Sequence, residues 1–229
     1  ALGLQRCGLH RRIALGILSL IGSQPRRLAL GFMVACYVLS MWISNTASVM
    51  VMLPIALSVL SDVRARGEEP ARRLGPPLIL GIAYAADIGG MATPVGTPPN
   101  LVFMSVLGDL FPNIPTPTFA QWMVMGVPLS IVFLLVGWYL LARWIFRLPA
   151  DSVMDSSDAV TRARRELGPV TRDERVCGAV FAVVALLWIT GSDLQLGASL
   201  RIPGWRSALG LKEVGDAAVA VAGGISLFL

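Results

Sequence analysis

The sequence has little charge, a single histidine and few cysteines. Only 14% of its 229 residues are charged and 55% are hydrophobic, whereas a soluble domain typically has about 25% charged residues. The mean hydropathy of +0.70 agrees with this balance. Apolar segments recur along the whole chain, so neither a signal peptide nor a single anchor explains the composition. We therefore predict an all-α integral membrane protein of the inner or plasma membrane.

The scarce residue types also exclude several kinds of site. His10 lies beside arginines, and Cys7, Cys36 and Cys177 are scattered without CxxC spacing. They form no pattern typical of a zinc site or a disulfide framework. The net charge is +5, but the arginines gather at the ends of apolar segments, as they do in cytoplasmic loops. We expect no nucleic-acid partner and no enzyme activity, and no catalytic residue is predicted.

Apolar runs and charge together predict the order of elements. We expect an interfacial amphipathic helix at 1–23, a re-entrant hairpin at 24–60, a broken transmembrane helix at 74–110, a transmembrane helix at 119–146, a cytoplasmic linker at 147–175, a transmembrane helix at 176–190 and the start of another at 214–229. Segment 61–73 is mixed in charge and is expected to be an aqueous loop. The chain begins at Ala1 and ends inside an apolar run at Leu229, so we expect a piece of a longer polypeptide.

The hairpin prediction rests on Ser44-Asn45-Thr46, a polar tip inside the apolar run from Leu28 to Leu60. Arginines flank both ends of this run, which indicates that both ends are cytoplasmic. Each arm reaches only about 20–25 Å at ~1.5 Å per residue, short of the ~30 Å hydrocarbon core. The alternative is one long tilted helix whose hydroxyls bond to its own carbonyls. That helix would leave the Asn45 amide unsatisfied and would be unusually long.

The broken helix is predicted from residues 88–100, which hold three glycines and three prolines. Proline removes a backbone donor and forces its predecessor away from helical angles, so a helix cannot continue here. Pro98 and Pro99 stand where a second half-helix would begin. Such breaks expose carbonyls, which suit a cation, and a helix N-terminus, which suits an anion. A kinked but continuous helix is the alternative.

Ser44-Asn45-Thr46, followed further along by Gly96-Thr97-Pro98-Pro99-Asn100, resembles the N-terminal half of the divalent anion/sodium symporter family. These are sodium-coupled dicarboxylate, citrate and sulfate transporters. The resemblance implies two inverted repeats in the full protein, each with a hairpin tip and a broken helix, and a homodimer in the membrane lipid. This sequence contains one copy of these features, so the piece alone is not expected to transport.

The resemblance also implies the site residues. Sodium would bind the side chains of Ser44 and Asn45 and the carbonyls of Ser40 and Gly96. Asn45, Thr46 and Thr97 would face the carboxylate or sulfate of the solute. Neutral oxygens of this kind suit a hard cation. Sodium and the anion should then raise each other's affinity reciprocally.

The expected function is sodium-coupled symport of divalent anions, most simply C4-dicarboxylates, by alternating access. Asp87 leaves an alternative open, because an acid in a membrane segment can add to cation binding or transfer a coupling proton. Relatives often have a small neutral residue there. A proton-coupled anion carrier or antiporter is therefore the second reading, and an aspartate that only bonds to the scaffold is equally open. A non-transporting membrane subunit is the third.

Overall fold

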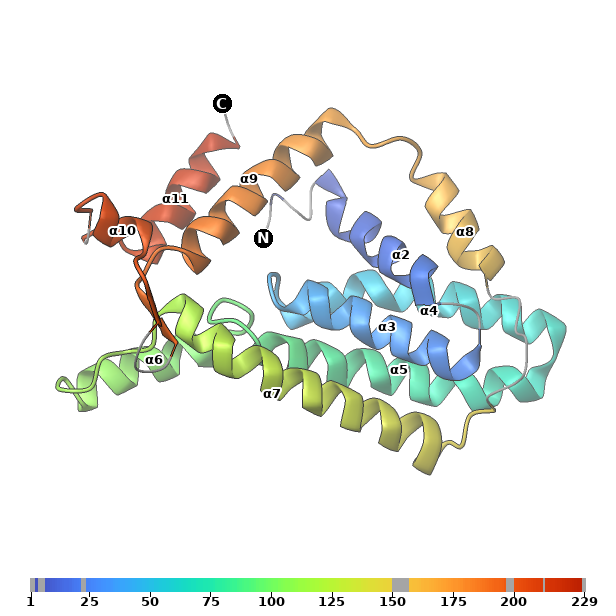
Figure 1. Ribbon diagram of the computed structural model, residues 1–229. Helices are drawn as coiled ribbons and strands as arrows, with labels where there is room; N and C mark the ends of the chain where they lie inside the picture. The colour runs from blue at the N-terminus through green and yellow to red at the C-terminus, as the bar shows by residue number, and fades with distance from the viewer. Residues whose placement is uncertain are drawn as a thin grey trace.

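The computed structural model describes residues 3, 7–21, 24–149, 157–196, 200–211 and 213–227, and within them the chain is almost entirely helical (Figure 1). The helices are α2 (Leu9–Ile21), α3 (Pro25–Ser40), α4 (Asn45–Arg66), α5 (Glu68–Met91), α6 (Pro98–Leu110), α7 (Phe119–Tyr139), the π-helix η1 (Leu140–Ile145), α8 (Ser157–Glu166), α9 (Arg172–Ile189), α10 (Trp205–Ala208) and α11 (Asp216–Ser226). A short antiparallel pair, β1 (Leu194–Leu196) and β2 (Leu200–Ile202), joins α9 to α10. Parts of the predicted interfacial helix and of the predicted linker, residues 150–156 among them, lie outside the described residues.

Local sequence signals account for the starts of several helices. Thr118 and Thr171 form capping boxes at the starts of α7 and α9, each with the side chain three residues on. Prolines occupy the first position of α3 and α6, where the missing N–H leaves no bond unmade. Prolines also lie inside α4, α5 and α7, and membrane helices tolerate them when neighbours satisfy the freed carbonyls.

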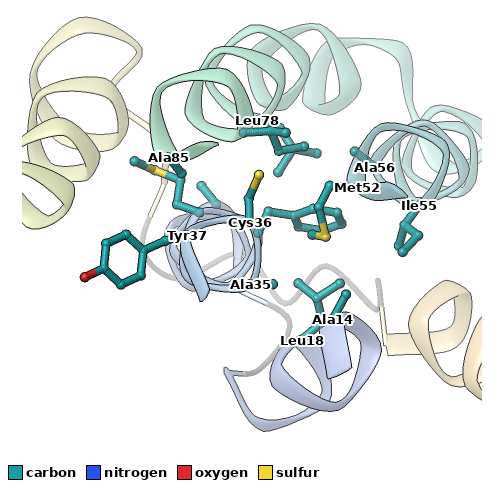
Figure 2. Close-up of a cluster of buried hydrophobic side chains, with 14 of the residues drawn as sticks. Ala14, Leu18, Ala35, Cys36, Tyr37, Met52, Ile55, Ala56, Leu78 and Ala85 are labelled. Carbon is teal, nitrogen blue, oxygen red and sulfur yellow. The ribbon is translucent and has the colours of Figure 1, made fainter. Parts of the chain in front are cut away.

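The core is built around α3, in which eleven of sixteen residues are buried. Figure 2 shows Cys36 and Ala35 of α3 between α2, α4 and α5, each of which contributes buried side chains. Toward its C-terminal end, the buried residues of α5 are small, namely Ala85, Ala86, Gly89 and Gly90, and there the backbones of α3 and α5 approach closely. At Gly89 an added Cβ would lie 2.4 Å from the carbonyl oxygen of Tyr37. Close backbone packing through small residues is the usual way in which membrane helices associate.

The α3–α4 pair is a helical hairpin whose turn spans residues 41–44. Helix α4 continues to Arg66, so its arm is longer than the apolar run suggested. Whether the hairpin is re-entrant depends on the membrane position and stays a prediction. The predicted loop at 61–73 is wrong, because this segment is helical on both sides of Gly67. Glutamates in the first turn of α5 and arginines in the last turn of α4 complement the helix dipoles, which stabilises helix through this charged segment.

Three of the described helices are long and apolar enough to cross a membrane: Asn45–Arg66, Glu68–Met91 and Phe119–Ile145. With the composition, they agree with the predicted integral membrane protein. Helix α5 is the most deeply packed of the three, whereas α7 runs along one side of the bundle with most of its apolar face open (Figure 1). Helix α5 ends at Met91 and α6 starts at Pro98, so the segment expected as a broken helix has its break at residues 92–97.

Candidate functional site

The hairpin tip lies beside the break between α5 and α6. Helix α3 ends at Ser40, and α4 starts at Asn45 after its N-cap, Ser44. The Ser44 hydroxyl accepts a hydrogen bond from the Ala47 N–H at 3.3 Å. Serine is a preferred N-cap because its oxygen satisfies an N–H that the first helical turn leaves free. The cap therefore fixes where α4 begins and leaves Asn45 as its first residue.

Three oxygens converge next to Asn45. The Ser40 hydroxyl lies 2.8 Å from Asn45 Oδ1 and 2.6 Å from the carbonyl oxygen of Ala86. Ser40 is completely buried. A hydroxyl has one proton, so the two acceptors compete for it. At most one of these short contacts is a full-strength hydrogen bond, and a cation bound among the three oxygens would offset the remaining repulsion between them.

The other end of the Asn45 amide faces Asp87. Asn45 Nδ2 donates to Asp87 Oδ1 at 2.9 Å, and the Asp87 side chain is exposed. The amide is thus oriented with its oxygen toward Ser40 and its nitrogen toward the carboxylate. This contact places a formal negative charge beside the oxygen cluster, so Asp87 belongs to the same site as the tip.

Two glycines let the break pack against the tip. A Cβ at Gly90 would lie 2.6 Å from Asn45 Oδ1 and 3.2 Å from the Cβ of Thr97. A Cβ at Gly96 would lie 2.5 Å from the carbonyl oxygen of Gly90. Asn45 and Thr97 therefore lie against the same glycine, and any side chain there would push them apart.

Residues outside the predicted site hold the break in shape. Asn100 donates both amide hydrogens, to the Gly90 carbonyl at 2.8 Å and the Thr93 carbonyl at 2.9 Å. The Thr93 hydroxyl donates to the Met41 carbonyl at 2.5 Å, which ties the break to the hairpin turn. Gly90 and Asn100 were not among the predicted site residues. Paired glycines in an apolar helix were the available signal for close backbone approach.

The two helix N-termini near the site differ in what they offer an anion. Among the described residues, no partner is present for the backbone N–H groups of Asn45 and Thr46, the first two of α4. Helix α6 begins with Pro98 and Pro99, which have no N–H, and the next N–H bonds to the Thr97 carbonyl at 3.1 Å. We expected the N-terminus of the second half-helix, α6, to bind an anion. The N-terminus of α4 is better suited, because its first two N–H groups have no partner among the described residues.

The predicted site residues take several places. Ser40, Asn45, Asp87, Gly96 and Thr97 come together at the tip and the break. Ser40 contributes its hydroxyl to the observed contacts. The Ser44 side chain is engaged as the N-cap, and Thr46 is exposed at the start of α4. No group of three or more His, Cys, Asp or Glu residues able to hold a metal occurs in the described part of the chain. The cluster consists instead of neutral oxygens with one carboxylate beside it.

Comparison with known proteins gives the family. Residues 1–227 match the family described as citrate transporters. The chain belongs to this family. It is 33% identical, over its whole length, to a sodium-dependent dicarboxylate transporter, SdcS, of Staphylococcus saprophyticus, and covers 43% of that protein. A second SdcS, from Staphylococcus aureus, is 35% identical over 83% of the chain, which covers 37% of that protein.

These relatives confirm the resemblance drawn from the two motifs. The family is one of transporters and not of enzymes, and this chain is an integral membrane protein of the plasma membrane. The chain spans less than half the length of the curated relatives it matches. The activity of a complete protein that contains this chain is therefore a matter for proposal.

Proposed function

We propose that this chain provides half of the binding site of a sodium-coupled symporter for C4-dicarboxylates. The observation that supports this most directly is the cluster formed by the Ser40 hydroxyl, Asn45 Oδ1 and the Ala86 carbonyl, three oxygens within 2.8 Å contacts with one proton to share. Two relatives with about one third identity are named as sodium-dependent dicarboxylate transporters. Citrate and sulfate remain the competing substrates within the same reading.

Sodium binds at this cluster in our proposal. Hydroxyl, amide and carbonyl oxygens form sodium sites in transporters where helices are interrupted. Ser40 and Asn45 come from the hairpin, and Gly96 from the break would add its carbonyl. The Ser44 side chain, the other predicted ligand, would have to exchange its bond to the Ala47 N–H for the ion.

The dicarboxylate binds beside the ion, at the N-terminus of α4. The free N–H groups of Asn45 and Thr46, the Thr46 hydroxyl and the positive end of the helix dipole all favour a carboxylate there. Thr97 lies against the same glycine as Asn45, so in this proposal it also faces the bound carboxylate. Sodium both fixes the Asn45 side chain and offsets the charge of the anion, so each ligand raises the affinity of the other.

The remaining half of the site would come from a second, inverted copy of the hairpin and broken helix in the complete protein. The hairpin, with both ends cytoplasmic, is re-entrant in this reading, and the complete protein is a homodimer. Alternating access then moves the site from one side of the membrane to the other. The driving force is the sodium gradient.

Succinate uptake by the complete protein in proteoliposomes tests the proposal. Replacing external sodium with choline should reduce uptake at least tenfold. Asn45→Ala should abolish sodium-dependent uptake. It removes the proposed ligand Oδ1, and it removes the amide nitrogen whose bond to Asp87 holds that oxygen toward Ser40. Asn113→Ala, the same change at an exposed residue, is the matched control and should leave uptake intact. Undiminished uptake in choline would refute sodium coupling.

A proton-coupled carrier is the second candidate, favoured by the contact between Asp87 and the Asn45 amide at 2.9 Å. Asp87→Asn keeps the shape and removes the charge. Under sodium coupling this variant should still transport, with a higher sodium concentration needed for half-maximal rate. Under proton coupling it should lose all uptake driven by a pH gradient in choline.

A cysteine at Thr46 separates a transporter from a membrane subunit that does not bind the solute. Succinate with sodium should slow the labelling of Thr46→Cys by a soluble maleimide. The unsubstituted protein reports labelling of its own cysteines, and Thr116→Cys, at an exposed residue, reports effects unrelated to the site. Equal labelling with and without succinate would contradict the proposed pocket.

A further inference from the structure

A cavity lies away from the hairpin tip, along the seam between α4 and α5. It has a volume of about 730 Å³ and lies near the turn at Gly67 that joins the two helices. In Figure 1 this turn is at the far right, at the opposite end of α5 from α6. Its floor and walls are mainly apolar, with Leu57 from α4 and Ile79 and Leu80 from α5, all partly exposed. The groove is thus open and shaped by side chains of both helices.

Two arginines stand at one end of this groove. Arg64 and Arg72 both line it, and no acidic residue does. Nearby acids are already paired, Glu69 with Arg73 at 2.9 Å and Asp62 with Arg162 at 3.1 Å. Glu68 is exposed and does not line the groove. Within the described ranges, no hydrogen bond or ion pair engages the guanidinium group of Arg64 or Arg72, so their charge is available to an anion.

The positive-inside rule would place the basic end of this groove where a lipid headgroup meets its acyl chains. Both helices are long and apolar enough to span a membrane, and arginines at such helix ends mark the cytoplasmic interface. From Arg64 to Leu57 the helix advances by about 10 Å at 1.5 Å per residue. The charged end of the groove would therefore lie at the level of the headgroups, and its apolar end in the hydrocarbon.

We propose that this groove binds an anionic phospholipid of the cytoplasmic leaflet. The phosphate lies between Arg64 and Arg72, and one acyl chain lies along Leu57, Ile79 and Leu80. Basic pockets between membrane helices on the cytoplasmic side bind anionic headgroups in this way. A free phosphate or a dicarboxylate would use the arginines but not the apolar wall, and a zwitterionic lipid would use the wall but gain little from the arginines. The proposal depends on the membrane position of α4 and α5 and not on the transported solute.

Native mass spectrometry of the complete protein in detergent, titrated with phosphatidylglycerol, tests this. We expect one tightly bound phosphatidylglycerol per chain, and weaker binding of phosphatidylcholine with the same acyl chains. Each arginine near an anionic headgroup is worth about fivefold in affinity, so Arg64→Gln with Arg72→Gln should weaken binding about 30-fold. Leu57→Trp should also weaken binding by filling the apolar wall while both charges remain. Excess inorganic phosphate or succinate should not displace the lipid.

Arg73→Gln is the matched control. Arg73 lies next to Arg72 but is paired with Glu69 and does not line the groove, so this variant should bind phosphatidylglycerol normally. Equal affinities for the two lipids, or an unchanged affinity in the double arginine variant, would overturn the proposal. So would failure of a lipid-soluble maleimide to label Ile79→Cys in lipid-free protein, since that would show the groove to be covered by another protein segment.

Discussion

The two ends of the α3–α4 hairpin have opposite chemistry. At the tip, the turn at 41–44 and the break at 92–97 contain no lysine or arginine, and the contacts join neutral oxygens, glycines and the Asp87 carboxylate. At the base, Arg26 donates to the Leu148 carbonyl at 2.6 Å, and Trp138 Nε1 donates to the Arg26 carbonyl at 2.9 Å. The base is thus tied to the end of the α7–η1 helix by a cation and its backbone.

This difference suits the tip to binding an ion and the base to holding the hairpin in place. Fixed cations at the tip would compete with a bound sodium ion, whereas oxygens without enough protons favour it. At the base, the positive-inside rule would place the arginines at the aqueous interface, where their charge costs little. Changes at the tip should therefore act through close packing and oxygen geometry, and changes at the base through hydrogen bonds and charge.

The largest effect is expected from Gly89→Ala, at the tip end of α5. The new Cβ would lie 2.4 Å from the carbonyl oxygen and 2.9 Å from the Cα of Tyr37, both backbone atoms that cannot rotate away. Overpacking of this kind costs about 3 kcal/mol or more when the backbone itself must move. We expect a fall in the melting temperature of the complete protein, measured by scanning fluorimetry, and loss of succinate uptake.

Gly137→Ala is the control for this prediction, since Gly137 lies in α7 near the base, next to Trp138. There the nearest atom to an added Cβ is 3.9 Å away, in the flexible Met33 side chain. Alanine is better than glycine inside a helix by roughly 1 kcal/mol, so this variant should be as stable as the parent or more so. Comparable destabilisation by both changes would contradict the close approach of α3 and α5 at the tip.

Much of this architecture was predictable, because long apolar runs indicate membrane helices and prolines and glycines indicate where a helix is interrupted. The apolar runs located the helices, and the prolines and glycines located the break. The extent of α4 was not predictable from hydropathy, because arginine, alanine and glutamate extend a helix into water as readily as leucine does inside the membrane. Segment 61–73 was expected to be a loop for the same reason.

The sequence predicted that residues of the tip and the break would lie close together, but not which bonds they would make. The motifs selected Asn45 and Thr97, and the structure places both against Gly90. No sequence rule shows that the Ser40 hydroxyl meets Asn45 Oδ1, or that the amide of Asn45 turns its nitrogen to Asp87. Those contacts depend on how α3 and α5 pack, a tertiary property that one sequence does not encode locally.

An intermediate effect is expected from Arg26→Gln at the base. The substitution removes a charged donor from the Leu148 carbonyl, and Leu148 itself is almost completely buried. Hydrogen bonds to charged groups contribute about 1.5–3 kcal/mol, so stability should fall by about 2 kcal/mol. Arg27→Gln, one residue on and exposed, should have no measurable effect in the same melting experiment. Equal losses in both variants would show that charge alone, and not the bond to Leu148, matters at the base.

The smallest effect is expected at another contact of an arginine, between α2 and the start of α9. This contact lies before residue 176, where the predicted transmembrane segment begins. The Arg12 guanidinium donates to Glu174 Oε1 at 3.0 Å, and the Thr171 N–H donates to Oε2 at 2.8 Å; these bonds hold the pKa of Glu174 below its ordinary value.

A lowered carboxyl pKa stabilises the fold above the ordinary value of about 4.3, and the contribution disappears as pH falls through the folded pKa. Glu174→Gln should therefore lower the melting temperature at pH 7, and the gap to the parent should close as the pH falls through the lowered pKa of the folded protein. Glu166→Gln, whose exposed side chain lies 3.9 Å from Arg11, should show no gap at either pH, because a solvated pair at that distance contributes little. A gap for Glu174→Gln that stays constant with pH would mean that the glutamine fails for reasons of shape, and that the charge of Glu174 is not what joins α2 to α9.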